Sequence, residues 1–304
     1  MKRENSRLAG YLAAFLTIFI WGTTFTSSKI LLQILTPFEL LFMRFAIGYI
    51  GLILLSLGRG IPFLGKREAQ FALAGITGVT VHYLAENIAV QYSMASMVGI
   101  IKSISPFFIA LISSLVLREK KLGICFTAGF IIVMAGIIMV NTGDAAESGT
   151  VSAGNIWAVF SAFMWAVYSV IIKKMERIPY GIIAVTRRIF FYGILFMIPF
   201  FPVFGFQADI REIVKGTALL HLLFLGIGAS AVTFLSWNTA VKILGPVKTG
   251  VYIYFTPVIT AVVSAIWLKE PVTAWTLCGI VLILTGLSVS EGMFRGKKRS
   301  GRLK

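Results

Sequence analysis

The chain contains two copies of one hydrophobic unit, and this repeat constrains the fold more than any other feature. Residues 75–119 resemble residues 226–270 at a constant offset of 151. The matched pairs include Gly75/Gly226, Asn87/Asn238, Gly99/Gly250, Pro106/Pro257, Ser113/Ser264 and Glu119/Glu270. Chance does not keep one register through so many positions. Duplicated membrane halves around a central site are the common design of a transporter.

The composition excludes most soluble classes. Of 304 residues, 58% are apolar and only 13% are charged, about half the charged fraction of a soluble domain. The net charge of +16 does not indicate nucleic-acid binding, because Lys and Arg lie in short loops rather than on one polar face. Cys125 and Cys278 both lie inside apolar runs, so neither a disulfide framework nor a metal site is expected, and no cofactor.

The apolar runs predict an all-α polytopic membrane protein of ten helices. Each run has about twenty residues, which at a rise of ~1.5 Å per residue crosses a ~30 Å hydrocarbon core. The first run is long enough to span and lacks a cleavage pattern, so a cleaved signal peptide is not expected. The predicted helices are 8–28, 38–57, 70–91, 95–117, 122–140, 154–172, 182–203, 217–241, 247–267 and 272–290.

Loop charges predict that both termini are cytoplasmic in a bacterial cytoplasmic membrane. Basic residues gather at the N-terminus, in alternate loops and in the tail after the last helix, whereas the other side carries few. Five crossings per copy make the second copy enter from the opposite face, so the copies form inverted repeats. The predicted units are residues 8–140, residues 154–290 and a basic cytoplasmic tail, 291–304.

The early helices match at a second offset, 144, which pairs Trp21 with Trp165, Lys29 with Lys173 and Arg44 with Arg188. The change of offset by seven falls near the polar stretch 207–216, where an insertion in a loop explains it.

Several motifs resemble the EamA-type ten-helix members of the drug/metabolite transporter superfamily. They are the stretch from Trp21 to Phe25 followed by Lys29, the segment from Pro37 to Arg44, and proline-bearing helices that end at Glu119 and Glu270. The resemblance covers nearly the whole chain. It implies transport of small metabolites through a central cavity lined mainly by helices 1, 3, 4, 6, 8 and 9.

Two charged residues inside predicted spans are the leading candidates for the site. A carboxylate within a membrane helix costs several kcal/mol unless it is paired or faces water. Glu86 and Lys102 lie at similar depths in helices 3 and 4, so they can form a pair that binds solute or carries a proton; a structural ion pair is the alternative. The second copy has Trp237 and Ile253 at these positions, which favours solute recognition over scaffolding.

Aromatic and amide side chains complete the predicted cavity. The aromatic candidates are Trp21, Tyr83, Trp165, Trp237 and Tyr252, because large rings with polar tips suit an amphipathic solute. Asn87 and Asn238 are also candidates, although packing between helices explains conserved positions of the repeat better than solute contact.

Pro106 and Pro257 lie in mid-helix and remove a backbone hydrogen bond. The missing bond predicts either a static kink of the helix or a hinge that opens a gate, and the sequence favours neither alternative.

The predicted function is secondary transport of a small organic metabolite, such as an amino acid or its analogue, by alternating access, with export favoured by the resemblance. The expected partners are this solute, the lipid bilayer and, if transport is coupled, protons through Glu86; facilitated diffusion stays open. A membrane-embedded enzyme or receptor is the rival. Both aspartates, Asp144 and Asp209, fall in predicted loops, which disfavours enzymes that need carboxylate clusters.

Overall fold

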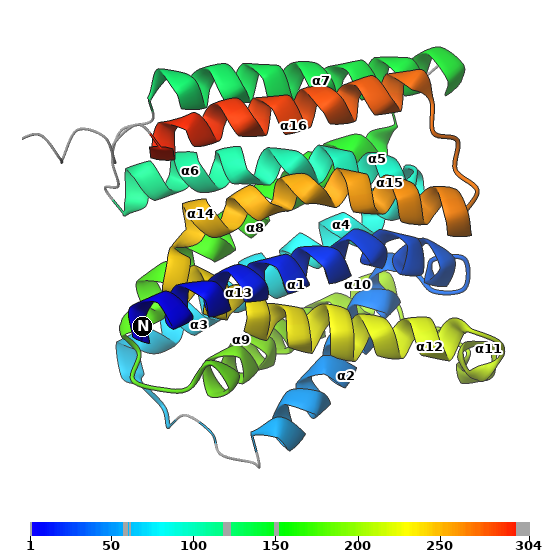
Figure 1. Ribbon diagram of the computed structural model, residues 1–304. Coiled ribbons are helices and arrows are strands. Elements are labelled where there is room, and N and C mark those ends of the chain that lie inside the picture. The colour runs from blue at the N-terminus through cyan, green and yellow to red at the C-terminus, as the bar shows by residue number, and fades with distance from the viewer. Residues whose placement is uncertain (1, 57–59, 61, 118–122, 149–151, 296–304) are drawn as a thin grey trace, which may run out of the picture.

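The computed structural model describes residues 2–56, 60, 62–117, 123–148 and 152–295, and every regular element in these ranges is helical (Figure 1). The first copy contains α1 (Lys2–Leu31), α2 (Pro37–Leu55), α3 (Glu68–Gly75), α4 (His82–Tyr92), α5 (Ala95–Ile101), α6 (Ser105–Val116) and α7 (Ile124–Ser148). The second contains α8 (Ala153–Lys174), α9 (Ile182–Met197), α10 (Phe201–Phe204), α11 (Ile210–Val214), α12 (Ala218–Leu223), α13 (Thr233–Leu244), α14 (Pro246–Gly250), α15 (Thr256–Trp267) and α16 (Ala274–Arg295).

Short 3-10 or π-helical stretches join several of these helices without breaking their course. The 3-10 turns are η1 (Gly65–Arg67), η3 (Lys102–Ile104), η4 (Met175–Arg177), η5 (Ile198–Phe200) and η7 (Val251–Phe255). The π-helical stretches are η2 (Ile76–Val81) and η6 (Phe224–Val232).

The chain is an all-helical membrane protein. In the described part of the chain, 7 helices are long and apolar enough to cross a membrane: Arg7–Leu31, Pro37–Leu55, Ala95–Val116, Ala153–Lys174, Ile182–Phe204, Ala218–Leu244 and Pro246–Trp267. Shorter apolar helices are Ile124–Met139 and Ala274–Gly286. The predicted span 70–91 is helical but more polar than these, because it carries His82, Glu86 and Asn87. The start of the predicted span 122–140 and most of the tail 291–304 lie outside the described residues.

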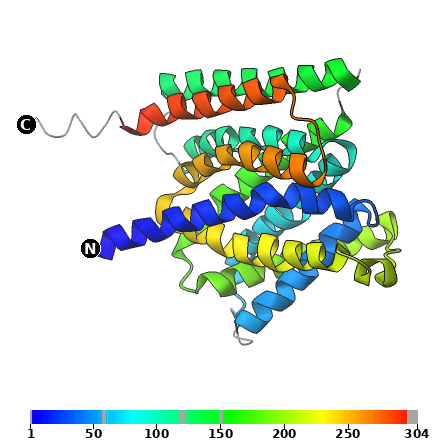
Figure 2. The same ribbon diagram turned by 45° about the vertical axis from the view of Figure 1, so that its right-hand side comes forward.

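The helices run largely along one direction of the bundle. The start of α1 and the end of α16 lie at the same end in both views (Figures 1 and 2). Helices α7 and α16 lie side by side as an outer layer. Glycines allow their close approach: a Cβ on Gly136 would lie 2.8 Å from the carbonyl oxygen of Gly279, and one on Gly286 would lie 2.6 Å from that of Gly129.

Each repeat proline is preceded by a 3-10 turn, and the reason is the amide that proline lacks. In a regular helix, residue 106 would donate to the Lys102 carbonyl, four residues earlier. The amide of Ser105 donates to that carbonyl instead. In the second copy, the amide of Thr256 donates to the Ile253 carbonyl, one residue before Pro257. The prolines therefore fix tight turns at Lys102 and at Ile253.

The π-helical stretches also fall at matched positions of the two copies. Each stretch contains a glycine where a helix from elsewhere passes too close for a side chain. A Cβ on Gly78 would lie 2.2 Å from the ring of Tyr168, and one on Gly226 would lie 2.6 Å from the side chain of Ile47. The extra residue in the π turn sets the rotation of α4, and with it the direction of His82 and Glu86.

The glycine contact between α7 and α16 predicts a stability difference between two alanine substitutions. Gly286→Ala places a methyl group against the Gly129 carbonyl, so we expect it to lower the free energy of unfolding by about 1–3 kcal/mol. Gly51→Ala in α2 is the control, because a Cβ at Gly51 meets nothing within 4 Å. We expect it to be neutral or stabilising by up to about 1 kcal/mol. Thermal unfolding in detergent measures both; equal effects would contradict the close packing.

Candidate functional site

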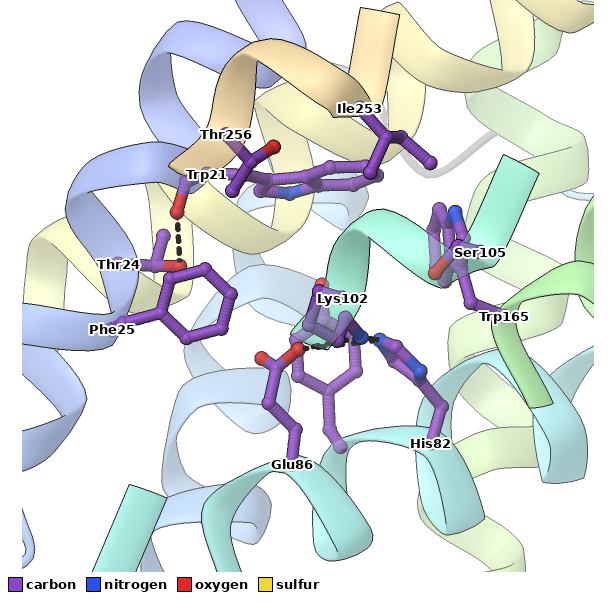
Figure 3. Close-up of a pocket in the computed structure, with 11 residues that line it drawn as sticks. Trp21, Thr24, Phe25, His82, Glu86, Lys102, Ser105, Trp165, Ile253 and Thr256 are labelled. Carbon is purple, nitrogen blue, oxygen red and sulfur yellow. Dashed lines mark hydrogen bonds and ion pairs between the residues drawn. The ribbon is translucent and has the colours of Figure 1, made fainter. Parts of the chain in front are cut away.

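A cavity inside the bundle is lined from both copies of the repeat (Figure 3). Its free interior is about 30 Å³, room for about two water molecules. The wall must therefore move outward to admit an organic solute. The lining residues are Trp21, Thr24, Phe25, His82, Tyr83, Glu86, Lys102, Ser105, Trp165, Ile253 and Thr256.

The polar side of the cavity is a buried ion pair. The Nζ atom of Lys102 lies 2.9 Å from Oε2 of Glu86, and both side chains are less than 10% exposed, at 9% and 8%. The same Nζ lies 3.0 Å from Oγ of Ser161 in α8 and 3.4 Å from Nε2 of His82. An ammonium group has three N–H donors, and here each donor has one acceptor. The Pro106 turn brings Lys102 to this position.

His82 lies one helical turn before Glu86 and is held in one tautomer. Its Nδ1 atom lies 2.9 Å from the carbonyl oxygen of Ser161, an acceptor only, so Nδ1 carries the proton. Nε2 is then an acceptor and faces Lys102, with Oε2 of Glu86 at 3.7 Å. A proton that reaches Nε2 would compete directly with the Lys102 contact.

The other side of the cavity is aromatic. The rings of Trp21 and Trp165 lie edge to face, with centroids 4.8 Å apart. Trp237 lies behind both, at 5.2 Å from Trp21 and 5.4 Å from Trp165. The Nε1 of Trp21 donates to Thr233 at 2.9 Å. In the described part of the chain, Nε1 of Trp165 and Oγ of Ser105 have no hydrogen-bond partner, although both residues line the cavity.

A second buried cation stands behind the cavity wall. Arg44 in α2 is 0% exposed, and its guanidinium carbon lies 4.3 Å from the centroid of the Tyr83 ring. Its Nε donates to Oγ of Ser230 at 3.1 Å. Nη1 and Nη2 have no hydrogen-bond partner among the described residues. With Lys102 and Arg44 against Glu86, the site carries one positive charge in excess.

Some of the predicted site residues line the cavity and the others lie outside its lining. The five that line it are Trp21, Tyr83, Glu86, Lys102 and Trp165. Trp237 packs behind the aromatic wall instead. Tyr252 lies away from the lining, with its ring 6.3 Å from that of Tyr11.

The two asparagines also lie outside the cavity lining. Asn87 donates from Nδ2 to the Pro37 carbonyl at 3.0 Å. Asn238 donates to Thr186 at 3.1 Å and accepts from the Tyr168 hydroxyl at 2.7 Å. Both amides therefore link helices, as buried polar groups in membrane proteins commonly do.

Two members of the polar cluster, His82 and Ser161, are not among the predicted site residues. His82 was available from spacing alone, because it lies four residues before Glu86 and so on the same helix face. Ser161 gave no such signal, since it comes from the other copy of the repeat. No group of three His, Cys, Asp or Glu residues in the described ranges is arranged as a metal site.

Comparison with known proteins identifies the family. A sequence profile of the EamA-like transporter family matches residues 8–142 and again residues 152–290. The chain belongs to the EamA-like transporter family. It is therefore a multi-pass membrane transporter rather than an enzyme, and the resemblance noted in the sequence is confirmed.

Relatives match along nearly the whole length of this family member. An uncharacterized transporter of Archaeoglobus fulgidus is 28% identical over 91% of this chain and 95% of its own. A probable terminal-alkyne amino-acid exporter of Streptantibioticus cattleyicolor is 24% identical over 94% of this chain and 95% of its own. A solved crystal structure aligns with a TM-score of 0.71 at 21% identity, over 94% of this chain and 97% of that one, which supports the fold alone.

The buried ion pair predicts a coupling between two substitutions. Lys102→Met leaves the Glu86 carboxylate without its cation, so we expect it to lower the free energy of unfolding by about 3–5 kcal/mol. The double variant Glu86→Gln/Lys102→Met removes both charges, and we expect it to recover most of that loss. Denaturant unfolding in detergent measures the cycle, with Lys248→Met as the control, because Lys248 is an exposed residue of α14. Additive single effects would show that the two charges do not interact.

Proposed function

We propose that this transporter has ten membrane-spanning helices in two inverted five-helix repeats, with both termini in the cytoplasm. The bias of basic loops supports this orientation, as does the common end shared by the start of α1 and the end of α16. Trp21 and Trp165 are matched positions of the two copies, and their rings touch. Residues related by a pseudo-two-fold axis meet only where the axis passes, which supports a site between the halves. The proposed units are 8–140 and 154–290, followed by a basic tail.

We propose further that the solute is an amino acid or a close analogue with an apolar side chain. The observation that carries this proposal is the Glu86–Lys102 pair at 2.9 Å, which faces the rings of Trp21 and Trp165. A zwitterion offers a carboxylate to Lys102 and an ammonium to Glu86. Its side chain then lies against the indole rings.

Unpartnered donors support binding of a carboxylate in particular. Ser105 Oγ and Trp165 Nε1 are buried at the cavity wall without hydrogen-bond partners in the described part of the chain. Buried donors of this kind cost free energy until an acceptor reaches them. The excess positive charge from Arg44 acts in the same direction. Alternating access would carry this solute past the midplane, and the relative described as a probable amino-acid exporter supports export.

The charge pattern predicts which ligands stabilise the purified protein. L-Phenylalanine, which carries both charges and a ring, should raise the free energy of unfolding by about 3 kcal/mol at a concentration about 100 times its Kd. Phenethylamine lacks the carboxylate and 3-phenylpropionate lacks the amine, so we expect much smaller shifts from either. Thermal unfolding against this series is the measurement.

Two variants, measured with the same three ligands, serve as controls. Trp21→Ala should weaken every ligand with a ring, whereas Glu86→Gln should remove the preference for the zwitterion over phenylpropionate. Stabilisation of wild-type protein by phenethylamine equal to that by phenylalanine would overturn the zwitterion proposal.

Proton coupling through Glu86 is a second element of the proposal. A proton on Glu86 removes the charge that binds the solute ammonium, so proton and solute compete for this carboxylate and their occupancies become linked. In proteoliposomes, a pH gradient should accelerate movement of radiolabelled phenylalanine by wild-type protein. Glu86→Gln should lose this acceleration and keep exchange between equal pools. Equal acceleration in both proteins would exclude Glu86 as the coupling group, and none in wild type would indicate facilitated diffusion.

A further inference from the structure

The corner between α4 and α5 is held by a lysine from α1. Nζ of Lys29 donates to the carbonyl oxygens of Val90 at 2.7 Å, Gln91 at 3.3 Å and Ser93 at 2.7 Å. The last carbonyls of a helix have no partner within it, and a cation there also opposes the helix dipole. All three donors of Lys29 are thus engaged at the end of α4.

The same corner is held from the other side by a glutamate that follows α15. Oε1 of Glu270 accepts from the amide of Ala95 at 2.8 Å. Oε2 accepts from the amide of Ser96 at 3.0 Å and from its hydroxyl at 2.5 Å. These are the first amides of the helix Ala95–Val116, where a carboxylate is favourable. Lys29 and Glu270 also attract each other electrostatically. Glu270 belongs to the second copy and the corner to the first, so its contacts tie the halves at this end of the bundle, whereas Lys29 holds the corner within the first copy.

Residues at the start of α8 also form hydrogen bonds with this corner. Oγ of Ser93 donates to Asn155 Oδ1 at 2.8 Å and lies 2.9 Å from Oγ of Ser152, and Ser152 also bonds the Tyr92 carbonyl. The corner is therefore closed by elements from three directions, and in Figure 1 it lies at the end where α1 and α15 finish.

At the matched corner between α13 and α14, at the opposite end, the described residues do not make the corresponding lysine contact. Lys173, which the repeat pairs with Lys29, bonds Glu176 one turn further along the chain. In the described part of the chain it makes no contact with the last carbonyls of α13. A separate cavity lies beside this corner, lined by Glu176, Asn238 and Lys242 among others. Among the described residues, the lysine contact is thus made at one end of the bundle and not at its counterpart. Glu119, which the repeat pairs with Glu270, lies outside the described residues.

We infer that Lys29 and Glu270 form a latch that closes the α4–α5 end of the transporter, and that Lys173 makes the matching contact when the other end closes. Two copies of one unit can adopt each other's conformation, and exchange of the two conformations is how inverted repeats alternate access. In the exchanged state, Lys173 leaves Glu176 and donates to the last carbonyls of α13, while Lys29 leaves those of α4. Pro246 occupies the position of Ala95 and has no amide, so this second latch relies on its lysine more than the first does. The inference concerns the gates and is independent of which solute is carried.

Spin-label distances test the latch without any solute. Cys125 and Cys278 are first replaced by serine. One labelled pair, Gln33→Cys and Tyr92→Cys, reports on the α4–α5 end, and a second pair, Lys174→Cys and Lys248→Cys, reports on the other. Double electron–electron resonance in lipid nanodiscs gives the populations of closed and open distances at each end.

The two lysines should act in opposite directions. We expect Lys29→Met to lower the closed-to-open ratio at the α4–α5 end roughly tenfold, from the loss of a charge at a helix terminus. Lys173→Met should raise that ratio, because it removes the contact that stabilises the exchanged state. Lys29→Arg should keep most of the wild-type ratio. A lysine of purely structural importance would not produce shifts of opposite sign.

The matched control is Lys215→Met, because Lys215 pairs with Glu212 at the same spacing as Lys173 with Glu176 but lies in a loop. It should leave both distance distributions unchanged. If Lys29→Met fails to fold, Glu270→Gln tests the same latch and should shift the ratio in the same direction. Wild-type distributions in both Lys29→Met and Glu270→Gln would overturn the latch. An unchanged distribution in Lys173→Met would overturn the exchange, whatever the outcome of the ligand series.

Discussion

Backbone hydrogen bonding inside a membrane governs this structure. With no water in the hydrocarbon core, every backbone N–H and C=O must find a partner within the protein. Irregular backbone in a span therefore needs partners from elsewhere in the protein, and in this chain η3 and η7 each supply a residue of the cavity lining. The turn before Pro106 carries Lys102, and the π-helical stretch Ile76–Val81 directly precedes His82. These irregular stretches thus help to determine where the charged side chains point.

Duplication explains why the cavity has one polar and one apolar side. Glu86 and Lys102 have Trp237 and Ile253 as their counterparts at the offset of 151. The two pairs lie on opposite sides of the proposed pseudo-two-fold axis that relates the copies. Glu86 and Lys102 form the ion pair, whereas Ile253 lines the cavity and Trp237 packs behind its aromatic wall. An amphipathic site follows from a symmetric framework once one copy acquires charge and the other keeps apolar residues.

The sequence predicted what depends on periodicity and on matched positions. Run lengths predicted the helices, and equal depth in the membrane predicted the contact of Glu86 with Lys102. It did not predict that Asn238 would bond Tyr168 and Thr186, or that Tyr252 would face Tyr11, because those directions depend on helix rotation. Rotation is set by the π-helical stretches and the 3-10 turns, and a regular helical wheel drawn from sequence assigns the wrong face beyond each of them. Ser161 was missed for a related reason, since only the folded bundle brings it from the second copy to His82.

Residues shared by the copies and residues that differ between them serve separate purposes. Shared residues, such as Pro106/Pro257 and Asn87/Asn238, shape the turns and link the helices in both halves. The differing residues decide what each conformation stabilises. Lys29 and Lys173 are identical in type, yet one bonds helix carbonyls and the other bonds Glu176. In the proposed exchange of conformations, Lys29 and Lys173 interchange these contacts. A carrier needs two such conformations of similar free energy, since a strongly preferred state would hold the cavity closed to one side of the membrane.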